Sequence, residues 1–264
     1  MKKQYMLFSF PRQGTDFFMD CLISSNSNLK YYREFFNPIC AVPKYTKKIS
    51  EAFGSENNYK KIFFYNEDLL EGVYSDTWKL ENFNITKEVF SFSKIYFFKK
   101  HFELFALYRS RRNTFPTSRP DFILPIFNSF IEENYFHFEV KNEIKNYLKT
   151  FFFNNIEKQV LSHIFCWFLQ FHEIQKSEIK LIQYYPLMSL EKDGLDEYLN
   201  KNIPEELYNK ALSESIIKKR NKEIQPKRYC DYKDLNVEST CLNFIKFLEK
   251  LNTGLEDKYW DMLV

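Results

Sequence analysis

The sequence predicts an α/β protein: a three-layer fold built on a parallel sheet. Three observations support this. Short apolar runs of strand length alternate with stretches whose apolar residues recur at helical spacing. The first run is stopped by a proline and a glycine directly before such a helix. Residues 120–179 are rich in aromatic residues and helical in pattern. We therefore expect a single domain over residues 1–264 with a helical, aromatic-rich insert at about 120–178.

The chain opens with a strand, a tight loop and a helix. Residues 4–10 form an apolar run of strand type, and residues 11–14 end it. After Thr15, Phe18 and Leu22 stand four apart, which predicts a helix that ends in the Ser- and Asn-rich residues 24–28.

Further elements follow from the same patterns. Residues 62–64 indicate a second αβ element, and residues 156–174 have the apolar spacing of a helix. A helical C-terminal region is expected to begin near residue 195. Strands are expected at residues 85–92, 104–108 and 180–185, the last closed by Pro186.

Composition excludes several classes of protein. Only 5 of the 264 residues are glycine, which argues against collagen, glycine-rich disorder and multi-glycine dinucleotide-binding folds. A net charge of +3 does not require a nucleic-acid partner. The five cysteines form no CxxC pair, which favours free thiols in a reducing compartment. No apolar run reaches the length of a membrane helix. We expect a cytoplasmic protein that binds neither membranes nor nucleic acids.

The loop after the first strand has the residues of an anion site. Arg12, Gln13, Gly14, Thr15 and Asp16 stand where backbone N–H groups converge at a helix N-terminus. Glycine allows close approach of a phosphate, and arginine offers a planar cationic fork. The loop lacks the first glycine and the Lys-Ser/Thr pair of a Walker A motif. An ordinary βα turn is the alternative reading.

A second candidate segment follows the strand expected at 104–108. Four of the chain's eight arginines lie between Arg109 and Arg119, in a protein that otherwise uses lysine. Clustered guanidinium groups suit a phosphate, and a solvated loop is the alternative.

Together the two segments resemble the sulfotransferases that use PAPS (3′-phosphoadenosine 5′-phosphosulfate). In that family, a loop of the type P-[KR]-[ST]-G-[ST]-[ST] follows the first strand and holds the 5′-phosphosulfate. Pro11, Arg12, Gly14 and Thr15 match it, whereas Gln13 and Asp16 depart from it.

A later strand of the family ends in R-x-x-R-x-x-x-x-S, which holds the 3′-phosphate. Arg109, Arg112 and Thr117 keep this spacing, with threonine in place of serine. Residues 179–187 loosely resemble the strand before the family's YEDL element. The resemblance covers about residues 4–38, 84–120 and 179–200 and implies a P-loop NTPase-like fold. Within that family, the bacterial carbohydrate and small-molecule sulfotransferases are closest in character to this sequence.

The resemblance also indicates the catalytic base. The family's Lys-Thr-His element is missing, because residues 85–89 contain no histidine. The segment around Glu34 is similar to one in bacterial carbohydrate sulfotransferases whose glutamate contacts the acceptor hydroxyl. Glu34 is therefore the expected base and Glu88 the second candidate. Taken without the family, Glu34 beside Arg33 indicates a local ion pair.

The resulting hypothesis is an enzyme that moves a sulfuryl group from PAPS to a hydroxyl of a small molecule or carbohydrate, releasing PAP. Residues Arg12 to Asp16 would hold the 5′-phosphosulfate, and Arg12 would stabilise charge on the leaving oxygen. No metal is expected. The alternatives are a P-loop-like kinase or nucleotide hydrolase, and a catalytically inactive PAP-binding protein. The family's late GxxGxxK loop is absent. The basic residues 218–228 are a solvated face, a candidate cofactor loop or a nucleic-acid patch that lacks stacking aromatics.

Overall fold

The computed structural model describes residues 3–9, 14–36, 70–72, 74–79, 82–89, 95–109, 115–116, 141–150, 154–222, 229–230, 236–251 and 254–263. The chain forms two compact units. Unit 1 comprises Met1–Arg109 and Lys176–Ile224, and unit 2 comprises Ser110–Gln175 and Gln225–Val264. The single domain over 1–264 with an insert at 120–178 stays a prediction beside this division.

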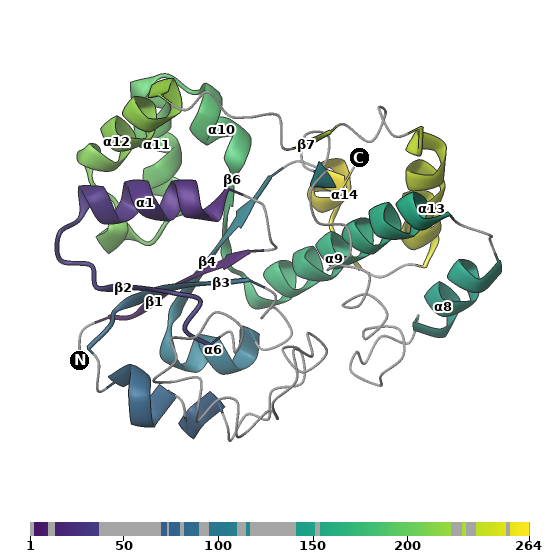
Figure 1. The fold of residues 1–264 in the computed structure, drawn as a ribbon, viewed down its shortest axis with the longest axis horizontal. Helices are drawn as coiled ribbons and strands as arrows, with labels where there is room; N and C mark the ends of the chain where they lie inside the picture. The colour runs from purple at the N-terminus through teal and green to yellow at the C-terminus, as the bar shows by residue number, and fades with distance from the viewer. Residues whose placement is uncertain are drawn as a thin grey trace. The chain divides into compact units, whose positions relative to one another are not determined.

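Unit 1 is an α/β structure around a five-stranded sheet in which every strand pair is parallel (Figure 1). The strand order is β2-β3-β1-β4-β6. The strands are β1 (Tyr5–Ser9), β2 (Tyr31–Arg33), β3 (Ile85–Val89), β4 (Glu103–Tyr108) and β6 (Lys180–Gln183). The predicted α/β class and parallel sheet are confirmed.

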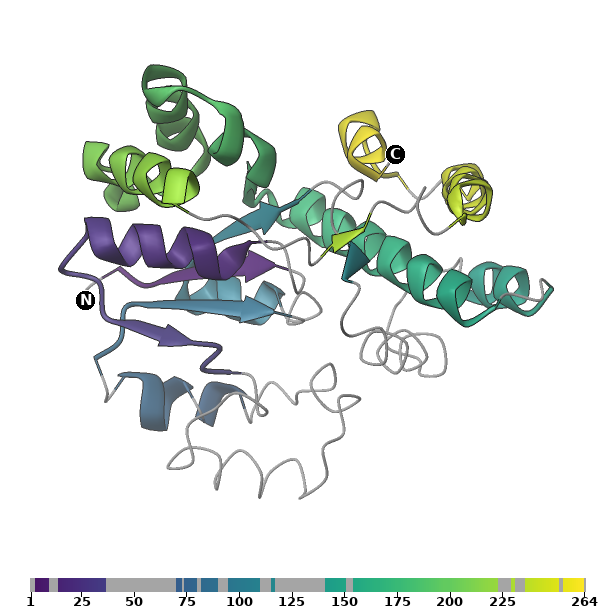
Figure 2. The ribbon, with the colours of Figure 1, turned by 45° about the horizontal axis from the view of Figure 1, so that its top comes forward.

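Helices cover both faces of this sheet (Figures 1 and 2). One face carries α1 (Thr15–Ser25), α10 (Tyr184–Ser189), α11 (Lys192–Asn202) and α12 (Lys210–Lys222), and the other carries α6 (Ile95–His101). A 3-10 turn, η5 (Glu205–Leu207), joins α11 to α12, and a π-helical turn, η1 (Tyr74–Trp78), precedes β3.

Side-chain alternation along β1 explains the two helical layers. Tyr5 and Leu7 join the core formed with α1, α11 and α12, which includes Phe18 and Leu22. Because successive strand residues face opposite sides, the fully buried Phe8 faces the α6 layer.

The strands predicted at residues 4–10 and 104–108 are confirmed as β1 and β4, and the helix predicted after Thr15 is confirmed as α1. Residues 85–89 of the strand expected at 85–92 form β3, and residues 90–92 lie outside the described part of the chain. The element expected at 62–64 also lies outside it. The short strand β2 was not predicted, because its pattern is only partly buried.

One boundary was wrong. The strand expected at 180–185, closed by Pro186, ends at Gln183, and Tyr184 begins α10. Pro186 is the third residue of that helix. Its missing N–H costs nothing there, because the first four N–H groups of a helix have no intrahelical acceptor.

Unit 2 is mostly helical in its described part. It contains α8 (Lys141–Thr150), most of α9 (Asn155–Ser177), α13 (Glu238–Lys250) and α14 (Asp257–Leu263), with a short antiparallel pair of β5 (Phe115–Pro116) and β7 (Tyr229–Cys230). Ring contacts join these helices: Tyr147 stacks on Phe247 at 4.1 Å between centroids, and Phe171 lies 5.3 Å from Tyr259.

Candidate functional site

The loop after β1 leaves the centre of the sheet. β1 lies between β3 and β4, so the chain departs toward one side after β1 and returns to the other side later. In open parallel sheets, ligands bind at such a switch point, beyond the carboxyl ends of the strands. Gly14, at the start of α1, lies at this edge, whereas Arg12 and Gln13 lie outside the described residues.

Gly14 has a left-handed backbone with φ of +86°, which favours glycine. Its carbonyl oxygen accepts the N–H of Phe18 at 3.1 Å and so begins α1. A Cβ at this position would overlap Cε2 of the Tyr184 ring. Both its conformation and the ring of Tyr184 therefore require glycine here.

The same ring connects Gly14 to the arginine-rich segment. The guanidinium carbon of Arg109, directly after β4, lies 4.6 Å from the ring centroid of Tyr184. Tyr184 itself follows β6. Segments that follow β1, β4 and β6 thus meet on one aromatic ring. Arg112 and Thr117 lie outside the described residues.

Thr15 and Asp16 are the first two residues of α1, and their side chains differ in exposure. Thr15 is buried, whereas the side chain of Asp16 is 58% exposed. The Asp16 carboxylate accepts a hydrogen bond from Nζ of Lys87 and lies 3.4 Å from an Nη of Arg33. Its negative charge is therefore directed toward cations on β2 and β3.

Arg33 and Lys87 are register neighbours on β2 and β3, so their side chains leave the same face of the sheet. Two adjacent cations repel each other unless anions lie between them. Asp16 from α1 and Glu34 from the turn after β2 supply these anions. One Glu34 carboxylate oxygen lies 3.6 Å from Nε of Arg33 and 3.6 Å from Nζ of Lys87.

Glu34, the expected base, is buried and has a left-handed backbone with φ of +51°. Its backbone N–H donates to the carbonyl oxygen of Lys87 at 2.9 Å. Because aspartate and glutamate tolerate this conformation only when the surroundings hold it, the bond to β3 fixes the turn.

Glu88, the second candidate, points to the opposite face of β3 and is fully buried. Its Oε1 accepts the N–H of Phe36 at 3.1 Å and the hydroxyl of Thr86 at 2.9 Å. Among the described residues, Oε2 has no hydrogen-bond partner. Burial raises the pKa of Glu88 to about 8; the Phe36 N–H opposes the rise and the Glu34 carboxylate adds to it.

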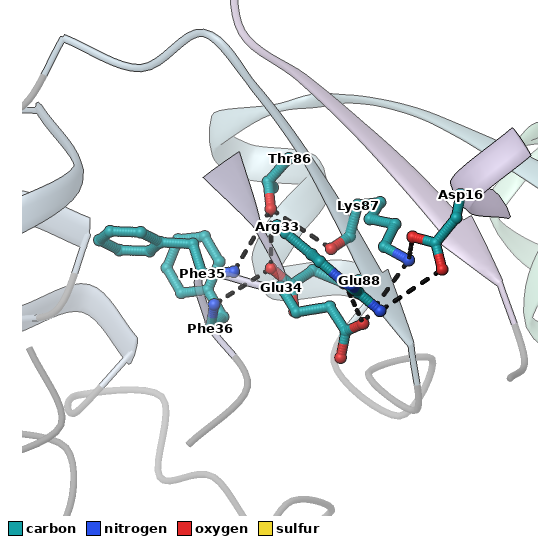
Figure 3. A network of polar contacts seen from close by, with 8 residues as sticks. All are labelled: Asp16, Arg33, Glu34, Phe35, Phe36, Thr86, Lys87 and Glu88. Carbon is teal, nitrogen blue, oxygen red and sulfur yellow. Dashed lines mark hydrogen bonds and ion pairs between the residues drawn. The ribbon is translucent and has the colours of Figure 1, made fainter. Parts of the chain in front are cut away.

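We call Asp16, Arg33, Glu34, Lys87 and Glu88 the β3 cluster (Figure 3). It contains three carboxyl groups and two cations. With Glu88 protonated at pH 7, the cluster has two anions and two cations and is electrically balanced.

Two residues of this region were not found from sequence: Lys87 and Tyr184. The sequence held a signal for Lys87: two adjacent charged residues, Lys87 and Glu88, stand inside the expected strand, directly after the buried Ile85 and Thr86. Tyr184 gave no such signal, because its role depends on Gly14 and Arg109, which are distant in sequence.

Within the described ranges, no group of three His, Cys, Asp or Glu side chains has an arrangement that could hold a metal ion. The helices of those ranges include none that is long and apolar enough to cross a membrane. Part of the basic run at 218–228 has structural partners: Arg220 donates to the carbonyl oxygens of Leu187 and Leu190 at the end of α10, and Lys219 pairs with Asp20. Compared with models of protein families, with curated proteins and with solved structures, the chain matches none.

Proposed function

We propose that the protein is a PAPS-dependent sulfotransferase with a P-loop NTPase-like fold, which transfers a sulfuryl group to a hydroxyl of a small molecule or carbohydrate. The observation that carries the proposal is the meeting of Gly14 and Arg109 on the ring of Tyr184. These are the two segments whose motifs resemble the 5′-phosphosulfate and 3′-phosphate loops of that family. They lie 95 positions apart in the chain, and the carboxyl edge of the sheet brings them together.

The sheet order supports a P-loop-like fold. Counted within the sheet, the order is 2-3-1-4-5, which differs from the 3-2-1-4-5-6 and 2-1-3-4-5 orders of common dinucleotide- and flavin-binding folds. The anion-type loop follows the central strand, β1. The donor, which carries both a phosphosulfate and a phosphate, needs cations and backbone N–H groups at this edge, and Arg109 and the start of α1 supply such groups.

In the proposed reaction, the acceptor hydroxyl oxygen attacks sulfur while the bond from sulfur to the 5′-phosphate oxygen breaks. Glu34 takes the hydroxyl proton, and PAP leaves with its negative charge facing Arg12. Lys87 and Arg33, each 3.6 Å from one Glu34 oxygen, keep this carboxylate oriented. Removing such a base typically lowers the rate 10²- to 10⁴-fold.

Binding of PAP tests the proposal directly. Millimolar PAP is expected to raise the melting temperature of the purified protein. Arg109→Ala should weaken PAP binding at least about 10-fold, because a charge-assisted phosphate contact contributes about 1.5–3 kcal/mol. Arg12→Ala should abolish transfer.

Lys201→Ala is the matched control, because it removes one exposed positive charge from the last turn of α11, near the amino end of β6, where Lys180 donates to the carbonyl oxygen of Ile203. Absence of any thermal shift with PAP would contradict the proposal. A shift with ATP and Mg²⁺ instead of PAP would favour the kinase alternative. PAP binding without turnover of any hydroxyl acceptor would favour an inactive binding protein.

A further inference from the structure

The turn that carries Glu34 is hydrogen-bonded to β3. Three successive backbone N–H groups of the turn donate to this one strand: Glu34 to the carbonyl oxygen of Lys87 at 2.9 Å, Phe35 to Oγ1 of Thr86 at 3.5 Å, and Phe36 to Oε1 of Glu88 at 3.1 Å. Figure 3 shows the Thr86 and Glu88 contacts on the face of β3 opposite to Lys87. The position of Glu34 therefore depends in part on the side chains of Thr86 and Glu88, which lie on the face of β3 opposite to Lys87.

We propose that Glu88 is a positioning residue: as a buried neutral acid, it holds the turn that presents Glu34, and its ionisation releases that turn. The inference rests on the proposed role of Glu34 as the base. It assigns Glu88 a role other than that of a second base.

The surroundings of Glu88 explain why it stays neutral. The Glu34 carboxylate, from the turn after β2, opposes its ionisation, and Lys87 on its own strand favours it; burial outweighs both and raises the pKa to about 8. On the α6 side, the described surroundings of the bonded residue are aromatic, since Phe36 packs against the rings of Phe98 and Phe102, at 5.1 and 5.8 Å between centroids.

Ionisation would place a third carboxylate in the β3 cluster. Its second oxygen, Oε2, has no hydrogen-bond partner in the described part of the chain, so a negative charge there would be poorly compensated. Relief requires water to enter or the turn at residues 34–36 to move. The proposal therefore predicts that the turn loosens as the pH rises through about 8.

Two variants separate positioning from catalysis. Glu88→Gln keeps an acceptor oxygen for Phe36 and Thr86 but cannot ionise, whereas Glu88→Leu keeps the size and loses the acceptor. We expect Glu88→Leu to lower kcat about 10- to 100-fold with little change in the KM for PAPS, and Glu88→Gln to restore most of that loss. Glu103→Gln, on β4 and separated from β3 by β1, is the matched control, since Glu103 pairs with the exposed Lys3.

The pH profile gives the second readout. Wild type and Glu103→Gln should lose activity above about pH 8, and Glu88→Gln should keep it. Activity lost in Glu88→Gln at pH 7 with the fold intact would overturn the proposal, because a base cannot be replaced by an amide. An alkaline loss that persists in Glu88→Gln would overturn it as well.

A third measurement does not depend on sulfuryl transfer. Carbon-13 NMR of labelled glutamate should show the Glu88 carboxyl titrating near pH 8, and hydrogen exchange at the Phe36 amide should lose protection at least about 10-fold more than the intrinsic pH effect between pH 7 and 9. If PAP does not bind but these changes occur, the proposed function fails and the Glu88 device stands. Titration of Glu88 near its ordinary value would overturn the device whatever the activity.

Discussion

At the scale of single residues, Tyr184 and Lys87 have the broadest effect on the candidate site. The ring of Tyr184 occupies the space that a side chain at position 14 would need, and it also supports Arg109. The side chain of Lys87 is only 2% exposed, and its Nζ pairs with the carboxylates of Asp16 and Glu34. A buried lysine of this kind is stable only because its partners are held in place.

Replacement of Gly14 tests the contact with Tyr184. Gly14→Ala should lower the free energy of unfolding by about 2–4 kcal/mol, because the left-handed backbone and the overlap with the Tyr184 ring both oppose a methyl group. Gly194→Ala is the control: Gly194 lies within α11, its added Cβ would be 3.6 Å from the side chain of Leu190, and the change should stabilise the fold by about 0.5–1 kcal/mol. Urea unfolding of both variants measures the difference. Equal effects would contradict the packing role of Gly14.

At the scale of elements, α1 is tied to the rest of unit 1 by two aspartates of unlike importance. Asp16 in its first turn pairs with Lys87 of β3, and Asp20, one turn later, pairs with Lys219 of α12. The two aspartate side chains are similarly exposed, at 58% and 63%, but Lys87 is 2% exposed and Lys219 is 26% exposed. Because Lys87 is buried and Lys219 is partly exposed, we expect the Asp16–Lys87 pair to stabilise α1 more than the Asp20–Lys219 pair.

Asp16→Asn should lower the free energy of unfolding by about 1–3 kcal/mol, because it leaves a buried cation with one carboxylate fewer. Asp20→Asn should change it by less than about 1 kcal/mol, as is usual for exposed pairs. Thermal unfolding at low and high salt checks both values. A larger loss for Asp20→Asn would show that α1 is held mainly by α12.

The elements also show how far sequence reasoning reaches. Apolar periodicity predicted β1, α1 and β4, because local burial decides those segments. It missed β2, in which two residues are half-buried and the third, Arg33, is exposed. It extended β6 past Gln183, because a proline is typical of a strand end, whereas Pro186 belongs to the first turn of α10. For the site, the anion-type loop and the role of Arg109 rest on motifs and stay predictions. The β3 cluster could not be predicted, since it depends on the register of β2 and β3.

At the scale of the whole molecule, each unit contains a buried titratable group. Glu88 in unit 1 has its pKa raised to about 8, and His163 in unit 2 has its pKa lowered to about 3, in both cases chiefly by burial. Burial favours the neutral form of both groups: the Glu88 carboxyl keeps its proton, and the His163 ring stays unprotonated. They therefore act on stability in opposite directions along the pH scale.

Between about pH 4.5 and 8, the folded state binds the Glu88 proton more tightly than the unfolded state, so the free energy of unfolding falls as the pH rises. Between about pH 3 and 6.5, unfolding allows His163 to take up a proton, so the free energy of unfolding rises with pH. The two contributions offset each other between about pH 4.5 and 6.5. Each amounts to about 5 kcal/mol at most over its window.

Stability should therefore be greatest between about pH 4.5 and 6.5 and fall on both sides. Glu88→Gln should remove the alkaline decline, and His163→Gln the acid decline. Urea unfolding from pH 3 to 9 measures both. A maximum above pH 8 in the wild type would contradict this account.

The ring cluster beneath the Glu34 turn has an optical consequence. Of the three tryptophans in the sequence, Trp78 alone belongs to unit 1, and it is fully buried against Phe35 and Phe36. Trp167 and Trp260 belong to unit 2. With those two replaced by phenylalanine, the emission of Trp78 becomes an intrinsic fluorescent reporter of the turn. A movement of the turn is then visible as a spectral change without any added label.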